Sequence, residues 1–254
     1  MQKKIEILKI TKDKKKFLVE TNEKEYKFNE DVIVEFLILK GKVFSEKEFK
    51  KIIKANDVSE IFNKTLNYLS FQQRSEYEIY SYIKEKGATG TDIDKIIKKL
   101  KDYGYIDDEK LANYLLDLVI RQKKGPKVLE KKLFEKRIDE ATTKDVLEKY
   151  NLDIEGEVVN SLCEGLVKKN TDKPVRIQKQ KIYEKLIRDG FSGEVINHYV
   201  SLLEFDDNSL EKLPLEIEKL EYKYRDLDEY KRKEKIIASL LRKGYDYSKI
   251  TKYL

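Results

Sequence analysis

The stretch YGYIDDEKLANYLLDLVIRQKKGPKVLEKKL, residues 103–133, contains the clearest helix signals of the chain. Within it, Gly104 can adopt the left-handed conformation that ends a helix. Asp107 or Asp108 can then accept hydrogen bonds from the free N–H groups at the start of the next helix. Residues 111–120 of that next helix are apolar on almost every side, so more than one neighbour must cover it. The stretch therefore predicts a central helix.

A dense group of cations follows this apolar helix. We expect Gly125 to end the helix, and Pro126 to begin another at a position where its missing N–H costs nothing. The cations of this region are Arg121, Lys123, Lys124, Lys127, Lys131, Lys132, Lys136 and Arg137, and its acids are Glu130 and Glu135. Eight cations against two acids leave a local charge of +6, which equals the net charge of the whole chain.

The composition indicates a mainly helical protein. Charged residues make up 40% of the chain, Gly and Pro are few, and Trp is absent, a balance typical of solvated helices. Cys163 is the only cysteine, which excludes a disulfide framework and favours a reducing compartment. Met1 is followed by charged residues instead of a signal region, and no stretch reaches the roughly 20 apolar residues of a membrane helix. We therefore expect a cytoplasmic protein.

The first forty residues differ from the rest and predict a small antiparallel sheet. Apolar and polar residues alternate in IEILKI (5–10), FLVET (17–21) and EYKF (25–28). Asp31 is then expected to cap an apolar helix over residues 32–39. Ser45 and Glu48 can form the capping box of a second helix, and a third is expected after Asp57. No strand is expected beyond these segments.

The remainder of the chain repeats. The segments 82–100, 132–150, 185–203 and 239–254 each contain a helix end, a short loop and a second helix with paired apolar residues. The four helix ends are Gly87, Arg137, Gly190 and Gly244. Their spacings of 50, 53 and 54 residues leave room for three helices per interval and are typical of helical repeat arrays.

The predicted fold class is therefore mainly α. Tandem three-helix repeats are expected to form an elongated, curved array with a small N-terminal antiparallel β region. The predicted parts are an N-terminal region of strands and helices (1–56) and four repeats (57–108, 109–155, 156–210 and 211–254).

Three motifs, in order along the chain, carry a family resemblance. They are TLNYLSFQQRSEYE (65–78), LKDYGYIDDEKLA (100–112) and RQKKGPKVLEKKLFEKRI (121–138). With them the chain resembles the bacterial regulatory protein RecX family, in its long form with an additional N-terminal region. Two positions depart from the family pattern: Gln72 stands where a basic residue is common, and Arg137 replaces a helix-ending Gly. A left-handed Arg137 costs on the order of 1 kcal/mol.

The resemblance implies a regulator that binds the RecA recombinase filament on single-stranded DNA and restrains its recombination and ATPase activity. It implies some direct DNA affinity and no catalysis. We also expect no cofactor, no membrane partner and a monomer.

The residues themselves offer no catalytic constellation. His198 is the only histidine and is expected to be structural or exposed, and Cys163 to be a small buried residue. Asp107 and Asp108 could form a metal or acid pair, but helix capping is favoured. The Gly-Ala-Thr-Gly of residues 87–90 lacks the strand and the Lys of a phosphate loop. We therefore expect no enzyme and no metal site.

Binding is better supported than catalysis. The candidate binding residues for DNA or a filament are Arg74, Arg121, Lys123, Lys124, Lys127, Lys131 and Lys132. If a helix begins near Gly125, then Lys124, Lys127 and Lys131 lie along one side of it as a row of cations. The alternative is a solvated helix face in a Lys-rich protein. Arg74 and Arg121 can pair with a carboxylate or a phosphate through a planar fork.

The tyrosines allow a further reading. Tyr77, Tyr80, Tyr82, Tyr103 and Tyr105 could stack on bases, but their helical spacing favours packing in the core. Two functional classes therefore stay open. The chain is either a regulator of a protein filament or a general single-stranded DNA-binding helical repeat protein, and the motifs favour the first.

Overall fold

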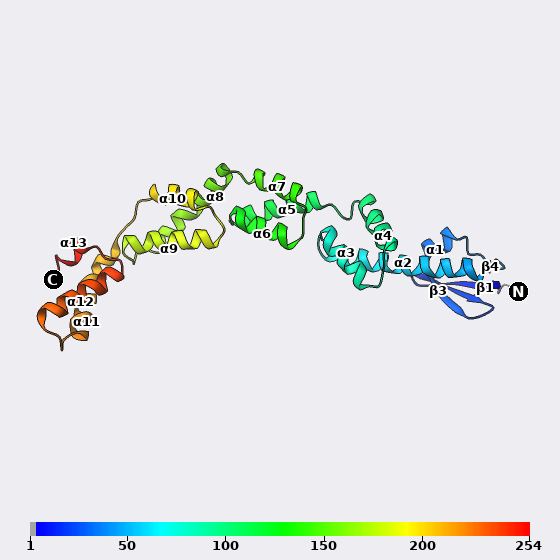
Figure 1. The fold of residues 1–254 in the computed structure, drawn as a ribbon, viewed down its shortest axis with the longest axis horizontal. Helices are drawn as coiled ribbons and strands as arrows, with labels where there is room; N and C mark the ends of the chain where they lie inside the picture. The colour runs from blue at the N-terminus through cyan, green and yellow to red at the C-terminus, as the bar shows by residue number, and fades with distance from the viewer. Residues whose placement is uncertain (1–3) are drawn as a thin grey trace. The chain divides into compact units, whose positions relative to one another are not determined.

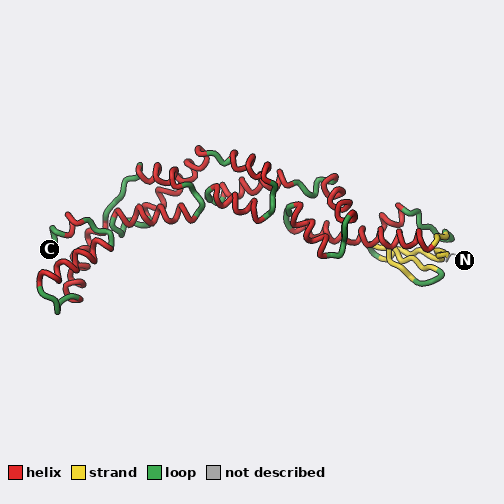
Figure 2. Tube along the Cα trace, in the orientation of Figure 1, coloured by secondary structure: helices red, strands yellow, loops and turns green. Residues whose placement is uncertain are grey.

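The computed structural model describes residues 4–254 and consists of two compact units. The first contains the chain up to Leu111 together with Lys136–Ile138, and the second contains Ala112–Glu135 and Asp139–Leu254. Figure 1 traces the chain from its N-terminal strands to the C-terminal helix. Within the described residues, strands occur only at the N-terminal end and helices make up most of the rest, as Figure 2 shows. The mainly α class with an N-terminal β region is thus confirmed.

A four-stranded antiparallel sheet opens the first unit. Its strands are β1 (Lys4–Asp13), β2 (Lys16–Thr21), β3 (Glu25–Asn29) and β4 (Val43–Ser45), in the order β3-β2-β1-β4. The three predicted strands are confirmed. Strand β4 was missed, because three residues are too few to show alternation; it pairs with β1 through Ile5 opposite Phe44. The buried face of the sheet includes Ile7, Val19 and Phe28.

Helix α1 (Glu30–Glu35) is shorter than predicted and begins earlier. Asn29 occupies the N-cap position, so the expected cap at Asp31 is wrong. The Asp31 carboxylate instead accepts a hydrogen bond from the Ser59 hydroxyl at 2.8 Å. The helix stops at Phe36, and Leu37 takes a left-handed conformation with φ of 48°.

Helix α2 (Glu46–Phe71) is continuous, so the predicted break before Asp57 is wrong. The predicted capping box of Ser45 and Glu48 is confirmed. Asn56, in the middle of α2, does not cap a new helix, and its side chain forms hydrogen bonds with the backbone of the sheet. The Asn56 side chain accepts from the backbone N–H of Asn29 at 2.8 Å and donates to the carbonyl of Lys27 at 3.2 Å. It thereby satisfies backbone groups of the edge strand β3.

Helices α3 (Glu76–Glu85) and α4 (Thr91–Asp102) pack against the second half of α2. Their shared core includes Ile79, Ile83, Ile96 and Leu100. Gly87 ends α3 with φ of 96° and Gly104 follows α4 with φ of 71°, so both predicted helix ends are confirmed. The sequence also has the capping-box pattern at Ser75 and Glu78, and both hydrogen bonds of this box are present at the start of α3.

The remaining elements follow one another with short connections. They are α5 (Asp108–Arg121), α6 (Pro126–Glu135), α7 (Glu140–Lys149), α8 (Leu152–Lys168), α9 (Val175–Arg188), α10 (Gly193–Ser201), η1 (Asn208–Lys212), α11 (Leu213–Lys223), α12 (Glu229–Arg242) and α13 (Tyr247–Ile250). One core joins α8, α9 and α10, and another joins η1 to α13. None of the described helices is long and apolar enough to cross a membrane. The division into four repeats and the elongated shape stay predictions.

Helix α5 ends differently from the prediction. It stops at Arg121, and Lys123 takes the left-handed conformation with φ of 51°, so Gly125 is not the residue that ends it. Gly125 instead allows a close backbone contact, because a Cβ atom there would lie 2.3 Å from the carbonyl carbon and oxygen of Gly190. The Gly125 N–H donates to the carbonyl of Asp189 at 2.8 Å. The start of α6 is therefore packed directly on the end of α9.

The same kind of contact recurs farther along the second unit. Gly244, with φ of 92°, ends α12 against the start of α9, where a Cβ would lie 2.4 Å from Ile177. The Arg176 side chain donates to the carbonyl of Leu241 across this contact at 2.9 Å. Arg137 stands at the matching position of the chain and also has a positive φ, of 55°. The predicted helix ends at Gly190 and Gly244 thus also serve to stack one helix on another.

Candidate nucleic-acid interface

The predicted basic segment lies at the end of α5 and along α6. Arg121 is exposed on the last turn of α5, and its Nε donates to the carbonyl of Asp117 at 3.3 Å. Lys123 is exposed in the left-handed position just after the helix. Neither cation forms an ion pair with another residue of the described chain. Both remain available to an anionic partner.

Lys124 has a structural role. It precedes α6, which begins at Pro126, so the expected row of Lys124, Lys127 and Lys131 on one helix is wrong in its first member. The Lys124 Nζ lies 2.7 Å from Oδ1 of Asp189. Burial opposes the charge of Asp189, but hydrogen bonds from Lys124 and Lys185 outweigh it and hold the pKa of this carboxyl below its ordinary value.

The backbone at Lys124 is fixed as well. The Tyr150 hydroxyl donates to the Lys124 carbonyl at 2.8 Å. Burial, together with the charge of Glu155, raises the pKa of Tyr150 to about 12. Tyr150 therefore stays protonated and acts as a donor throughout the physiological range. Lys124 is thus held at both its backbone and its side chain, and we assign it to the packing of the second unit.

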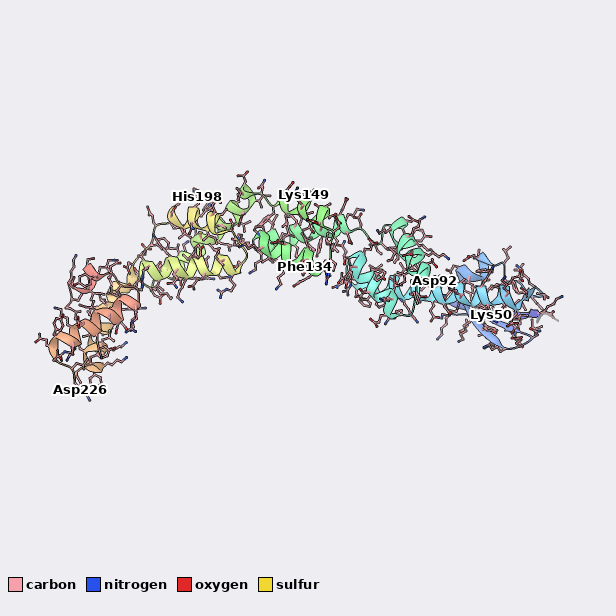
Figure 3. The ribbon with its side chains drawn as sticks, in the orientation of Figure 1. Lys50, Asp92, Phe134, Lys149, His198 and Asp226 are labelled. Carbon is pink, nitrogen blue, oxygen red and sulfur yellow. The ribbon has the colours of Figure 1, made fainter. Side chains whose placement is uncertain are left out.

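Helix α6 presents the other predicted lysines. Leu129 and Leu133 are fully buried, so the opposite face of the helix is turned to solvent. Lys127 and Lys131 are exposed, and the only ion pair that either forms within the described chain is a long 3.9 Å contact from Lys131 to Glu135. Lys132 is half-buried. Phe134, which Figure 3 labels, lies on the same helix with 71% of its surface exposed.

Arg74 is also engaged within the protein. Its guanidinium lies 4.3 Å from the ring centroid of Tyr68, and its Nη1 is 3.5 Å from Oε1 of Glu78. Lys136 reaches the same carboxylate at 2.8 Å. Burial opposes the charge of Glu78, but hydrogen bonds from Lys136 and Ser75 keep the pKa of Glu78 below its usual value. Arg74 therefore supports the start of α3.

Most of the tyrosines lie on the surface, which contradicts the expected core packing. Tyr82 is half-buried and stacks on Tyr68, a ring packed against the core, with 4.2 Å between ring centroids. Between 41% and 61% of the surface of the others is exposed, and these are Tyr77, Tyr80, Tyr103 and Tyr105. Their helical spacing was a misleading signal, because the core of this region is filled by isoleucines and leucines. The guanidinium of Arg137 lies 5.5 Å from the ring centroid of Tyr77, whereas the rings of Tyr80, Tyr103 and Tyr105 stay accessible.

The residues considered for chemistry have other roles. Cys163 is fully buried, and burial raises the pKa of its thiol. His198, which Figure 3 labels, is exposed on α10, and its ring meets that of Tyr199 edge-on. Asp107 accepts from the backbone N–H of Lys110 at 2.9 Å, which confirms the predicted cap. Among residues 4–254, no group of three His, Cys, Asp or Glu side chains could hold a metal ion.

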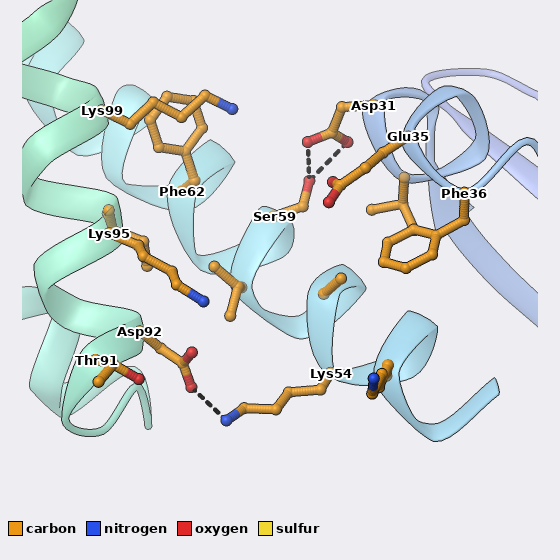
Figure 4. A pocket seen from close by; sticks show the side chains of 15 residues that line it. Asp31, Glu35, Phe36, Lys54, Ser59, Phe62, Thr91, Asp92, Lys95 and Lys99 are labelled. Carbon is orange, nitrogen blue, oxygen red and sulfur yellow. Dashed lines mark hydrogen bonds and ion pairs between the residues drawn. The ribbon is translucent and has the colours of Figure 1, made fainter. Parts of the chain in front are cut away.

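A pocket of about 400 Å³ lies between α1, α2 and α4 in the first unit (Figure 4). Among the residues that line this pocket, the Lys54 Nζ lies 3.0 Å from the carboxylate of Asp92. The Nζ of Lys99 lies 4.5 Å from the ring centroid of Phe62. Sequence reasoning missed this pocket because its residues are scattered from 31 to 99. The available signal was the pair Lys95 and Lys99, which are spaced i, i+4 on the solvent face of α4.

Comparison with known protein families identifies two segments of the chain. Residues 62–100, from the end of α2 through most of α4, match the model of the first three-helix domain of RecX. Residues 208–254, which span η1 to α13, match the model of the third three-helix domain of RecX. The N-terminal sheet and α1 lie outside both matches.

Whole-chain relatives extend the similarity. A protein of Listeria welshimeri named regulatory protein RecX is 32% identical over 249 residues, covering 96% of this chain and 92% of the relative. A regulatory protein RecX of Streptococcus pyogenes is also 32% identical, with 95% of each chain covered. A crystal structure of regulatory protein RecX superposes with a TM-score of 0.64 at 28% identity, covering 77% of this chain and 98% of the other. The crystal structure of RecX from Lactobacillus salivarius superposes with a TM-score of 0.55 at 31% identity, covering 59% of this chain and 97% of the other.

Proposed function

Because the chain belongs to the RecX family of regulatory proteins, we propose that it binds the RecA recombinase filament on single-stranded DNA and inhibits its recombination and ATPase activity. The observation that carries this proposal is the extent of the similarity, which covers 96% of this chain and 92% of a regulatory protein RecX. We further propose that the protein acts by binding alone, without a cofactor, as a cytoplasmic monomer.

Tandem helical units suit this role physically. Each unit can make a weak contact with one part of a filament, and linked weak contacts combine into strong binding without any new contact. A net inhibitory effect requires tighter binding to a filament state that caps, releases or hydrolyses than to the growing state, because only differential affinity shifts an equilibrium. The separate cores of α8–α10 and η1–α13 allow such contacts to be distributed along the chain.

The exposed cations are the residues we assign to the filament or its DNA. Arg121, Lys123, Lys127 and Lys131 are all accessible at the end of α5 and on α6. Lys132, half-buried beside them, contributes at the edge of this surface. Lys124 and Arg74 act indirectly, since each is held by a carboxylate of the protein itself.

The second candidate is a general single-stranded DNA-binding repeat protein. The exposed lysines and tyrosines favour it, because cations and aromatic rings together bind unpaired strands without sequence preference. The two candidates differ in how they inhibit. A DNA binder competes for free strand, so added DNA relieves its effect and preformed filaments resist it.

The decisive experiment measures the ATPase activity of preformed RecA filaments as this protein is added. We expect inhibition at far fewer copies than there are RecA subunits, persisting when free single-stranded DNA is in modest excess. A strand-exchange assay under the same conditions should show the same inhibition. If inhibition appears only when the protein saturates the DNA, the general DNA-binding function is the correct one.

A further inference from the structure

A second groove of about 540 Å³ lies in the first unit, where the β1–β2 hairpin meets α2 and α4. Lys15 and Lys16 line it from the hairpin, Asn63 and Asn67 from α2, and Lys99 and Tyr103 from the end of α4. Its lining shares Asp31, Phe62 and Lys99 with the pocket of Figure 4, so the two hollows are neighbours. The lining joins residues from the N-terminal sheet with residues of the first three-helix domain.

The charge at this groove is positive. The tip of the hairpin, residues 12–16, carries Lys12, Lys14, Lys15 and Lys16, and the one acid of this segment, Asp13, is paired with Lys27 at 3.2 Å. Lys15 and Lys99 form no ion pair with any residue from 4 to 254, whereas Lys16 reaches Glu60 at 3.4 Å. Two cations at the groove therefore lack a counter-charge from the described chain.

Two acids also line the groove. The carboxylate of Asp31 accepts a hydrogen bond from the Ser59 hydroxyl at 2.8 Å. Glu30 lies in the first turn of α1. Neither acid forms an ion pair with a lysine of the groove in the described chain. Phosphate groups can therefore approach Lys15 and Lys99.

One end of the groove carries aromatic rings. Tyr103 is 61% exposed and Tyr105 is 53% exposed, with 6.3 Å between their ring centroids in an edge-to-face arrangement. The Lys99 Nζ lies 6.0 Å from the centroid of Tyr103. Exposed rings beside lysines can stack on unpaired bases while the lysines neutralise the phosphates between them. The exposed amides of Asn63 and Asn67 add hydrogen-bonding groups along the α2 floor.

We propose that this groove binds single-stranded nucleic acid, with Lys15, Lys16 and Lys99 on the phosphates and Tyr103 stacked on a base. An acidic protein segment would use the lysines but would gain little from the aromatic end. A duplex would offer phosphates but no free base faces. The site uses other residues than the basic surface of α5 and α6, and it gives the N-terminal region a binding role. The inference rests on the proposed function only in the choice of DNA as the natural strand.

The first test measures the salt dependence of binding to a fluorescent oligodeoxythymidine in the absence of RecA. The triple variant Lys15→Gln, Lys16→Gln, Lys99→Gln should flatten the slope of log K against log salt by up to about 2 units, at about 0.7 per phosphate contact. The matched control carries the same charge change at three exposed lysines away from the groove, Lys47→Gln, Lys84→Gln and Lys168→Gln. Its slope should equal that of the wild type. Far-UV circular dichroism should show that both variants are folded. The double variant Lys15→Gln, Lys99→Gln keeps the ion pair of Lys16 with Glu60, so a flatter slope in this variant cannot come from the loss of that pair.

The second test isolates stacking. Tyr103→Ala should weaken binding of a 2-aminopurine oligonucleotide by roughly tenfold and reduce its fluorescence change, because one stacked base is lost. Tyr103→Phe should bind like the wild type, since it keeps the ring. If Tyr103→Ala binds normally while poly-glutamate displaces the oligonucleotide at equal charge, the groove takes an acidic protein segment and the proposal is wrong.

The outcomes separate this inference from the proposed function. A wild type that inhibits RecA, together with groove variants that keep the full salt slope, overturns the groove site and leaves the function standing. A wild type that binds the oligonucleotide through the groove but leaves the RecA ATPase unaffected supports the site and overturns the function.

Discussion

At the scale of single residues, the start of α6 depends on the absence of a side chain at Gly125. A Cβ atom at this position would lie 2.3 Å from the backbone of Gly190, and backbone on both sides leaves little room to relax. We expect Gly125→Ala to lower the free energy of unfolding by about 1–3 kcal/mol, as overpacking does. Gly165→Ala is the matched control, because Gly165 lies within α8 with no atom within 4 Å of an added Cβ.

The control should move in the opposite direction. Ala is preferred to Gly inside a helix by about 0.5–1 kcal/mol, so Gly165→Ala should stabilise the protein by that amount. Urea unfolding followed by circular dichroism measures both variants. Equal stabilities for Gly125→Ala and the wild type would show that α6 and α9 are not packed as closely as the structure places them.

A left-handed lysine gives the second residue-scale prediction. Lys123 ends α5 with φ of 51°, a conformation that costs a residue with a Cβ about 1–2 kcal/mol but is free for Gly. We expect Lys123→Gly to raise the free energy of unfolding by about 0.5–1 kcal/mol after the entropy cost of Gly. Lys132→Gly, in the middle of α6, should lower it by about 1 kcal/mol. If Lys123→Gly is as unstable as Lys132→Gly, then Lys123 does not adopt the left-handed conformation at the end of α5.

At the scale of elements, the sequence predicts those whose cause is local. The ends at Gly87 and Gly190 and the capping box at Ser75 follow from the chemistry of one turn, and all three are confirmed. Helix α2 was wrongly divided at Asp57, because an Asp can start a helix, whereas α2 runs through it without a break. The neighbouring Asn56 amide binds strand β3, which lies 27 residues away in the sequence at Asn29. Contacts at such separations leave no periodic trace in the sequence.

The candidate site shows the same limit. The sequence identifies the cations of α5 and α6, and Lys127 and Lys131 are indeed exposed. It could not show that Lys124 is committed to Asp189, which lies 65 residues later. The sequence could not predict the groove beside Tyr103 either, because its walls come from the hairpin and from α4, which lie far apart in the sequence.

The junction of α6 with α9 should weaken in acid through Asp189. Burial opposes the charge of this carboxyl, but Lys124 and Lys185 lower its pKa below the ordinary value of 3.8. A carboxyl with a lowered pKa in the folded state contributes stability above its unfolded pKa, and this contribution is lost as the pH falls through the folded pKa. We therefore expect Asp189→Asn to lower the free energy of unfolding by about 2 kcal/mol at pH 7.

The difference between Asp189→Asn and the wild type should shrink as the pH falls below about 4. Urea unfolding at a series of pH values measures it. Asp117→Asn is the control, because Asp117 is exposed on α5 and its carboxylate forms no ion pair with the described residues. A stability difference for Asp189→Asn that stays constant down to the lowest pH would show that the carboxylate charge is not what joins α6 to α9.

At the scale of the whole molecule, the groups of helices α8–α10 and η1–α13 have separate apolar cores, so each group can make its own contact with the proposed filament partner. Residues 208–254 contain their own core, in which Leu213, Ile236 and Leu240 are buried. The core of α8–α10 contains Cys163 and draws no residue from that segment. A chain that lacks residues 208–254 should therefore keep α8–α10 folded. The lone cysteine provides the check, since its buried thiol should stay unreactive towards a thiol reagent until urea is added.

The truncated chain tests whether inhibition depends on linked contacts. If successive units bind neighbouring RecA subunits, removing the last unit removes one linked contact and should weaken inhibition of preformed filaments by about 100-fold. The Arg121→Ala, Lys127→Ala, Lys131→Ala variant of the full chain should instead lose affinity mainly as salt rises, because it removes charge but keeps every unit. Full-strength inhibition by a truncated chain with a protected Cys163 would contradict the linked-contact mechanism. It would place the inhibitory contact wholly within residues 1–207.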